Sequence, residues 1–109
     1  MCACNSSTKF KMRVEYAHHD YRRLAEDPQY THGFGPEVVR AYRKRIGFLL
    51  ACVDERDIYQ MKSLHFEKLS GNRAHQRSIR LNAQFRLVFE IRMDASGKLI
   101  VVIDVVDYH

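Results

Sequence analysis

Three side chains capable of acid–base chemistry close the printed sequence, Asp107-Tyr108-His109. They follow an apolar, mostly β-branched run over residues 99–103, which is the pattern of a strand buried on both faces. Because side chains alternate along a strand, we expect Asp107 and His109 on one face and Tyr108 on the other. An imidazole and a carboxylate at the end of a rigid strand can transfer protons near neutral pH. The alternative is a polar chain end that only faces water.

Metal ligation is a second kind of chemistry, and the spacing of cysteines and histidines does not favour it. The chain has three cysteines, and neither the pair Cys2 and Cys4 nor the isolated Cys52 predicts a disulfide framework or a structural metal site. The run His18-His19-Asp20 falls at an expected helix start, where adjacent side chains do not converge on one ion. We therefore expect no metal and no cofactor.

Two amphipathic helices are expected in the first half of the chain. The first covers residues 17–26 and stops at Asp27-Pro28. The second begins at Pro36 and carries an apolar stripe of period near 3.6, formed by Val38, Val39, Tyr42, Ile46, Leu49, Leu50 and Val53. Its basic residues Arg40, Arg43, Lys44 and Arg45 lie mainly off that stripe, either as a solvated face or as a binding surface. Asp57 is expected to cap a short third helix.

The rest of the chain alternates in the manner of strands. Strands are expected at Phe10–Tyr16, Ser78–Leu81, Phe85–Arg92 and Lys98–Tyr108, with a loop or edge over Glu67–Gln76. Asn82-Ala83-Gln84 is expected to join the second and third of these as a hairpin. Arg77 and Arg80 have opposite parity and therefore face opposite sides. This order predicts an α+β fold, with an antiparallel-rich β-sheet and two or three helices packed on one face.

Length and composition indicate one globular domain. Hydrophobic residues make up 46% of the 109 residues and charged residues 28%, which suits a folded domain over residues 10–109 after a disordered tail over residues 1–9. No run is long enough to cross a membrane and no signal peptide is evident, so a cytoplasmic location is expected. The net charge of +5 favours an acidic partner such as nucleic acid.

The second half of the chain resembles a known family. The matching segments are Phe66-Glu67-Lys68-Leu69-Ser70-Gly71-Asn72-Arg73, Gln76-Arg77-Ser78-Ile79-Arg80-Leu81-Asn82, Gln84-Phe85-Arg86-Leu87 and Val106-Asp107-Tyr108-His109. In order and spacing they are similar to the RelE/HigB superfamily of bacterial type II toxin–antitoxin toxins, in its HigB or plasmid maintenance killer branch. The resemblance implies a compact α+β toxin that enters the ribosomal A site, cleaves messenger RNA and is silenced by a HigA-like helix-turn-helix antitoxin.

The resemblance transfers catalytic roles to some positions directly and leaves others open. Arg86 matches the family's arginine, and Asp107, Tyr108 and His109 match its terminal triplet. Many relatives carry a lysine before the glycine at Gly71 and an acidic residue after it, where this chain has Ser70 and Asn72. The family's upstream catalytic histidine falls on Glu67 without gaps, with His65 two residues away, so both stay candidates. Lys68 is a candidate substitute for the missing lysine.

Cleavage of RNA can use the 2′-hydroxyl of the substrate as nucleophile, so the protein must supply a base, an acid and positive charge. Arg86 is suited to stabilise the transition-state charge. Its alternative is an ion pair with Glu90 or a neighbouring strand. Phosphate contacts from ribosomal or messenger RNA are expected at Lys68, Arg73, His75, Arg77 and Arg80.

Three functions are compatible with the sequence. They are a ribosome-dependent messenger-RNA endonuclease, a ParE-like toxin that inhibits gyrase, and a non-catalytic RNA-binding module. ParE-like toxins lack the combination of Arg86 with a terminal Asp-Tyr-His, so the sequence favours the endonuclease. Net charge does not separate the endonuclease from the RNA-binding module.

Overall fold

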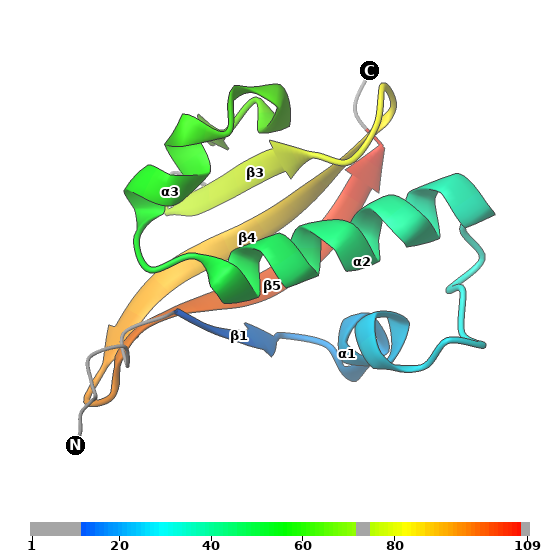
Figure 1. The fold of residues 1–109 in the computed structure, drawn as a ribbon, viewed down its shortest axis with the longest axis horizontal. Coiled ribbons are helices and arrows are strands. Elements are labelled where there is room, and N and C mark those ends of the chain that lie inside the picture. The colour runs from blue at the N-terminus through cyan, green and yellow to red at the C-terminus, as the bar shows by residue number, and fades with distance from the viewer. Residues whose placement is uncertain (1–11, 72–74, 108–109) are drawn as a thin grey trace.

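Residues 12–71 and 75–107 are described by a computed structural model, which places helices against one face of a single sheet (Figure 1). The strands take the order β1-β5-β4-β3-β2, with β1 parallel to β5 and the other pairs antiparallel. The elements in chain order are β1 Arg13–Tyr16, α1 His19–Glu26, α2 Pro36–Ala51, α3 Glu55–Gln60, the 3₁₀ helix η3 Lys62–Leu64, β2 Glu67–Lys68, β3 Gln76–Arg80, β4 Phe85–Asp94 and β5 Gly97–Asp107. The expected α+β class is confirmed.

Strand β5 lies inside the sheet between β1 and β4, which explains its apolar sequence. Ile100 and Val102 are fully buried in the core beneath the helices, and Leu99 and Val101, on the other face, are each 6% exposed. The predicted burial of this strand on both faces is therefore confirmed. A bulge interrupts its pairing with β4, because Val88 lies opposite Asp104 and the next residue, Phe89, lies opposite Val102.

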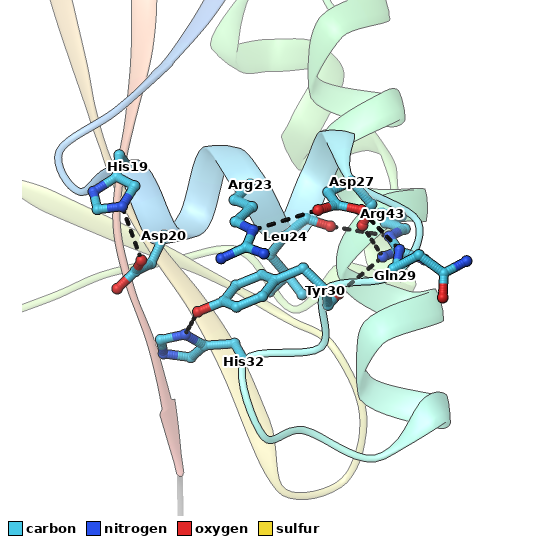
Figure 2. A network of polar contacts seen from close by, with 9 residues as sticks. All are labelled: His19, Asp20, Arg23, Leu24, Asp27, Gln29, Tyr30, His32 and Arg43. Atoms are coloured by element: carbon cyan, nitrogen blue, oxygen red, sulfur yellow. Dashed lines mark hydrogen bonds and ion pairs between the residues drawn. The ribbon is translucent and has the colours of Figure 1, made fainter.

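Helix α2 crosses the sheet and covers its core, and the predicted start at Pro36 is confirmed. The core cluster that includes residues of β3, β4 and β5 also contains five residues of the predicted stripe, Val38, Val39, Tyr42, Ile46 and Leu49. The other two, Leu50 and Val53, are 48% and 51% exposed, and Val53 lies beyond the end of the helix at Ala51. Two of its basic side chains bind main-chain carbonyls. Arg43 donates hydrogen bonds to the carbonyl oxygens of Leu24, Asp27 and Tyr30, at 2.9–3.1 Å, and so ties α1 and the following loop to α2 (Figure 2). Arg45 Nε donates to the Arg80 carbonyl at 3.1 Å.

The cap of the third helix differs from the prediction. Asp54, and not Asp57, is the N-cap, and its carboxylate accepts from the Arg56 N–H at 3.3 Å. Asp57 stands three residues later and accepts from the backbone N–H groups of Val53 and Asp54, at 2.8 and 3.3 Å. The two aspartates form a capping box, in which the carboxylate of each accepts a hydrogen bond from a backbone N–H at the opposite end of the first helical turn. Predicting Asp57 as the N-cap was wrong because the reciprocal residue was taken for the cap.

The first strand is shorter than expected within the described range, Arg13–Tyr16, and Phe10 and Lys11 lie outside the described residues. The tail predicted over residues 1–9, with Cys2 and Cys4, also lies outside them. Among the helices that the structure describes, none has the length and apolar character needed to span a membrane.

Candidate active site

The described part of the terminal triplet is Asp107, the last residue of β5. Asp107 pairs with Phe85, whose side chain packs on the core, so both lie on the helix-covered face. Its carboxylate accepts a hydrogen bond from Gln84 Nε2 at 2.9 Å. Arg86 pairs with Val106 and therefore points to the opposite face. The structure thus separates Asp107 from Arg86 by the thickness of the sheet, and Tyr108 and His109 lie outside the described residues.

Arg86 is a buried residue, with 6% of its surface exposed. Its Nε donates to Ser78 Oγ at 2.9 Å, and its Nη2 donates to the carbonyl oxygens of His65 and Ser78, the latter at 3.3 Å. Ser78 is itself 1% exposed. Arg86 is therefore not a surface residue, because acceptors from β3 and from the turn after η3 enclose its guanidinium. The alternative of an ion pair with a neighbouring strand is confirmed in part, since Arg86 pairs with Glu67 of β2. Such contacts fix the orientation of a charged donor.

His65 follows η3 with left-handed backbone angles, φ 49° and ψ 53°. A residue other than glycine pays a free-energy cost of about 1 kcal/mol or more in this conformation. The Arg86 guanidinium compensates by donating to the His65 carbonyl. The His65 ring reaches Arg80, with 3.4 Å between Nε2 and Arg80 Nη1. The turn therefore brings the His65 ring next to Arg80 and the His65 carbonyl against Arg86.

Glu67 supplies a carboxylate to the same place. It lies on the two-residue edge strand β2 opposite Ser78, so its side chain shares the face of Ser78 and Arg86. Glu67 Oε1 is 3.7 Å from Arg86 Nη2, and half of the Glu67 side chain is exposed. A carboxylate in this position can accept a proton from a substrate bound to Arg86.

These side chains surround a pocket of about 200 Å³, lined by His65, Glu67, Arg80, Asn82, Ala83 and Arg86. Two arginines, one imidazole and one carboxylate line it together. Such a set can bind a phosphodiester and exchange protons with it. The pocket therefore brings Arg86 together with His65 and Glu67, the two residues that the sequence left as candidates for the upstream catalytic position.

The predicted phosphate-binding residues are distributed over both faces of the sheet. Arg80 lines the pocket, and its Nε donates to the Asn82 carbonyl at 3.2 Å. Arg77 faces the helices and pairs with Glu55 at 3.4 Å, so the predicted opposite parity of Arg77 and Arg80 is confirmed. Lys68 is exposed on β2, opposite Arg77.

The last two predicted phosphate-binding residues are His75 and Arg73. His75 Nε2 lies 3.0 Å from Glu90, a carboxylate that Arg92 also contacts. Arg73 lies outside the described residues.

Sequence reasoning did not identify Ser78 and Asn82 as site residues. Ser78 lies on β3 opposite Val88, two residues along β4 from Arg86, so the two side chains are diagonal neighbours on one face. Alternation alone assigns their faces but not the register that brings them together. Cys52 is buried, and burial raises its thiol pKa to about 11, which suits a packing role. Within residues 12–71 and 75–107 no three His, Cys, Asp or Glu side chains gather closely enough to hold a metal ion.

Comparisons with known proteins identify the family of the chain and the relatives of its fold. Residues 14–109 match a family described as RelE-like toxin of type II toxin–antitoxin system HigB. The fold is similar to a solved structure of the YoeB/ParE toxin from Agrobacterium tumefaciens, with 18% identity, a TM-score of 0.53, and 90% of this chain and 100% of that chain covered.

Two structures from Staphylococcus aureus are similar at lower TM-scores. A YoeB dimer has 17% identity, coverage of 91% and 98% and a TM-score of 0.49. A YoeB–YefM complex has 18% identity, coverage of 90% and 97% and a TM-score of 0.47. The curated proteins contain no match to this sequence.

Proposed function

The chain belongs to the RelE-like HigB toxins of type II toxin–antitoxin systems, and from this membership we propose that it cuts messenger RNA in the ribosomal A site. It would thereby act as an endoribonuclease that inhibits translation. The observation that carries the proposal is the pocket in which Arg86, Arg80, Glu67 and His65 meet. Toxin membership alone leaves the target open, and this set of side chains favours a phosphodiester.

In the proposed reaction the 2′-hydroxyl oxygen attacks the adjacent phosphorus. The O2′–P bond forms, the P–O5′ bond breaks, and the products are a 2′,3′-cyclic phosphate and a 5′-hydroxyl. Glu67 takes the 2′-hydroxyl proton, with His65 as the other candidate base. His109 protonates the leaving O5′, a role that requires the chain after Asp107 to depart from strand alternation, because alternation would put His109 with Asp107 on the face opposite Arg86. Arg86 stabilises the charge that develops on the phosphoryl oxygens. Because RNA supplies the nucleophile, these steps need no metal.

The remaining predicted residues act around this reaction in the proposal. Asp107 orients the chain end that carries His109, and Tyr108 stacks on a base or contacts phosphate. Arg80 holds a phosphate in the pocket, while Lys68, Arg73, His75 and Arg77 contact RNA outside it. The direct partners of Arg77 and His75, Glu55 and Glu90, compete with such contacts, so Arg80 is the strongest member of this set.

The proposal includes dependence on the ribosome, and the small size of the pocket supports it. A hollow of about 200 Å³ with polar groups can hold one phosphodiester but offers little surface to align a strand for in-line attack. The ribosome would supply that alignment by fixing the A-site codon. The proposed action on ribosomes would take place in the cytoplasm.

The proposed protein partner is a small HigA-like antitoxin with a helix-turn-helix domain, encoded beside the toxin. Type II toxins are neutralised by proteins, and the YoeB–YefM complex is an example of such a pair. The basic net charge of +5 suits an acidic contact surface on the antitoxin.

The test is cleavage of a defined messenger RNA by purified protein, with and without ribosomes halted at a known codon. We expect cuts in the A-site codon only when ribosomes are present, and none with Arg86→Ala. Magnesium is kept constant for the ribosome, and transition metals are removed by a selective chelator. Inhibition of gyrase supercoiling without any RNA cut would instead identify a ParE-like toxin. RNA binding without cuts would identify a non-catalytic module.

A further inference from the structure

A groove lies along α2 and η3 and shares no lining residue with the candidate active pocket. One part, a hollow of about 400 Å³, is lined by Glu37, Arg40, Ala41, Lys44 and Arg45. The other, of about 190 Å³, is lined by Lys44, Arg45, Phe48, Met61, Ser63 and Leu64. Because Lys44 and Arg45 line both parts, the two hollows form one continuous surface, which we call the α2–η3 groove.

The groove is cationic at one end and apolar at the other. Arg40 and Lys44 are exposed at the cationic end, beside the single carboxylate of Glu37. At the apolar end Phe48 is half-buried, and Met61 keeps 45% of its surface exposed. An exposed apolar side chain beside a basic ridge is typical of a surface that receives an amphipathic segment.

The other basic residue of the groove has a structural role. Arg45 Nε donates to the Arg80 carbonyl at 3.1 Å, which holds its guanidinium against the hairpin between β3 and β4. Arg40 and Lys44 are therefore the cations best placed to meet a partner. Two cations next to an apolar end suit carboxylates followed by apolar side chains better than a nucleic-acid strand, which presents phosphate along its whole length.

We propose that the α2–η3 groove binds an acidic, amphipathic segment of the antitoxin, a proposal that rests on the partner named under the proposed function. From Glu37 to Phe48 the helix advances about 16 Å at ~1.5 Å per residue, so the groove accommodates about three turns of a partner helix. Carboxylates of that segment contact Arg40 and Lys44, and its apolar side chains cover Phe48 and Met61. Since the active pocket is a separate surface, antitoxin binding and catalysis can be altered independently.

The experiment uses the full chain and the product of the neighbouring small gene that restores growth on co-expression. Lys44→Glu and Met61→Ser change the two ends of the groove. Arg22→Glu, on α1, and Met93→Ser, on β4, are matched controls, because both side chains are well exposed and belong to other elements. Affinity is measured by titrating the labelled partner, and toxicity by growth arrest at equal protein levels.

We expect each groove variant to weaken binding by roughly tenfold or more, as for residues central to an interface, with toxicity retained. The controls should stay within about threefold. Arg40→Glu is a further groove variant if Met61→Ser does not fold. Unchanged affinity in all groove variants overturns the inference. Loss of toxicity with unchanged affinity also overturns it, because that result would identify the groove as a ribosome contact. If no neighbouring small gene restores growth on co-expression, the proposed partner is overturned, and this inference with it.

Discussion

The buried hydrogen bond between Ser78 and Arg86 leads to a quantitative prediction, that Ser78→Ala destabilises the protein through Arg86. The two side chains are 1% and 6% exposed, and Arg86 Nε lies 2.9 Å from Ser78 Oγ. Ser78→Ala removes this acceptor from a charged donor at a site where water has little access. The guanidinium then keeps fewer contacts to fix it toward the pocket.

The expected size follows from the charge and burial of the pair. A hydrogen bond to a charged group contributes about 1.5–3 kcal/mol to the free energy of unfolding. For a domain near this size, each kcal/mol lowers the melting temperature by roughly 4–8 °C. Ser78→Ala should therefore lower it by on the order of 10 °C and also reduce RNA cleavage, because Arg86 is less well oriented.

A double-mutant cycle tests this reasoning by chemical denaturation of four proteins, namely the wild type, Ser78→Ala, Arg86→Met and the double variant. In the Arg86→Met background the serine has no guanidinium to accept from, so Ser78→Ala should there cost less by about 1 kcal/mol or more. Equal costs of Ser78→Ala in both backgrounds would refute the claim that the serine acts through Arg86, and would leave it with a packing role only.

Three further predictions concern other parts of the chain. Arg43→Met removes the donor to the carbonyls of Leu24, Asp27 and Tyr30, so the melting temperature should fall and hydrogen exchange in residues 27–35 should speed up; unchanged exchange would contradict this. Burial, together with the hydrogen bond to Asp104, raises the pKa of Tyr21 to about 12. Unfolded tyrosine loses its proton near pH 10, so the stability that Tyr21 contributes is present below about pH 10 and is lost as the pH rises toward 12. Denaturation at pH 9 and at pH 11 should therefore show a smaller decrease in the free energy of unfolding for Tyr21→Phe than for the wild type. His109→Gln should reduce RNA cleavage and leave the melting temperature nearly unchanged; full cleavage would exclude His109 as the acid.

Local patterns predicted the elements that carry the site. The start of α2 followed from Pro36 and the apolar stripe, and the buried strand followed from the run over residues 99–103, because both signals depend on neighbours in the chain. Parity alone separated Arg77 from Arg80, since alternation along one strand needs no knowledge of its partner.

Features that depend on strand pairing could not be predicted from the sequence. The bulge between Val88 and Phe89 adds one residue to β5 and so reverses which of its side chains face the helices. Before the bulge the core residues are Ile100 and Val102, and after it the helix-covered face carries Val105 and Asp107. The closeness of Ser78 to Arg86 and the left-handed turn at His65 likewise depend on register and on contacts between distant segments. No pattern within a single strand encodes them.

The most direct test of the central claim is to map messenger-RNA ends in cells after brief induction. Sequencing of 5′-hydroxyl ends, together with ribosome footprints, locates each cut relative to the codons in the ribosome. We predict that wild-type protein produces cuts inside A-site codons within minutes of induction, and that Arg86→Ala, at equal soluble levels, produces none. Growth arrest by the wild type without new ends in translated messages would contradict the assignment of the Arg86 pocket as a messenger-RNA cleavage site.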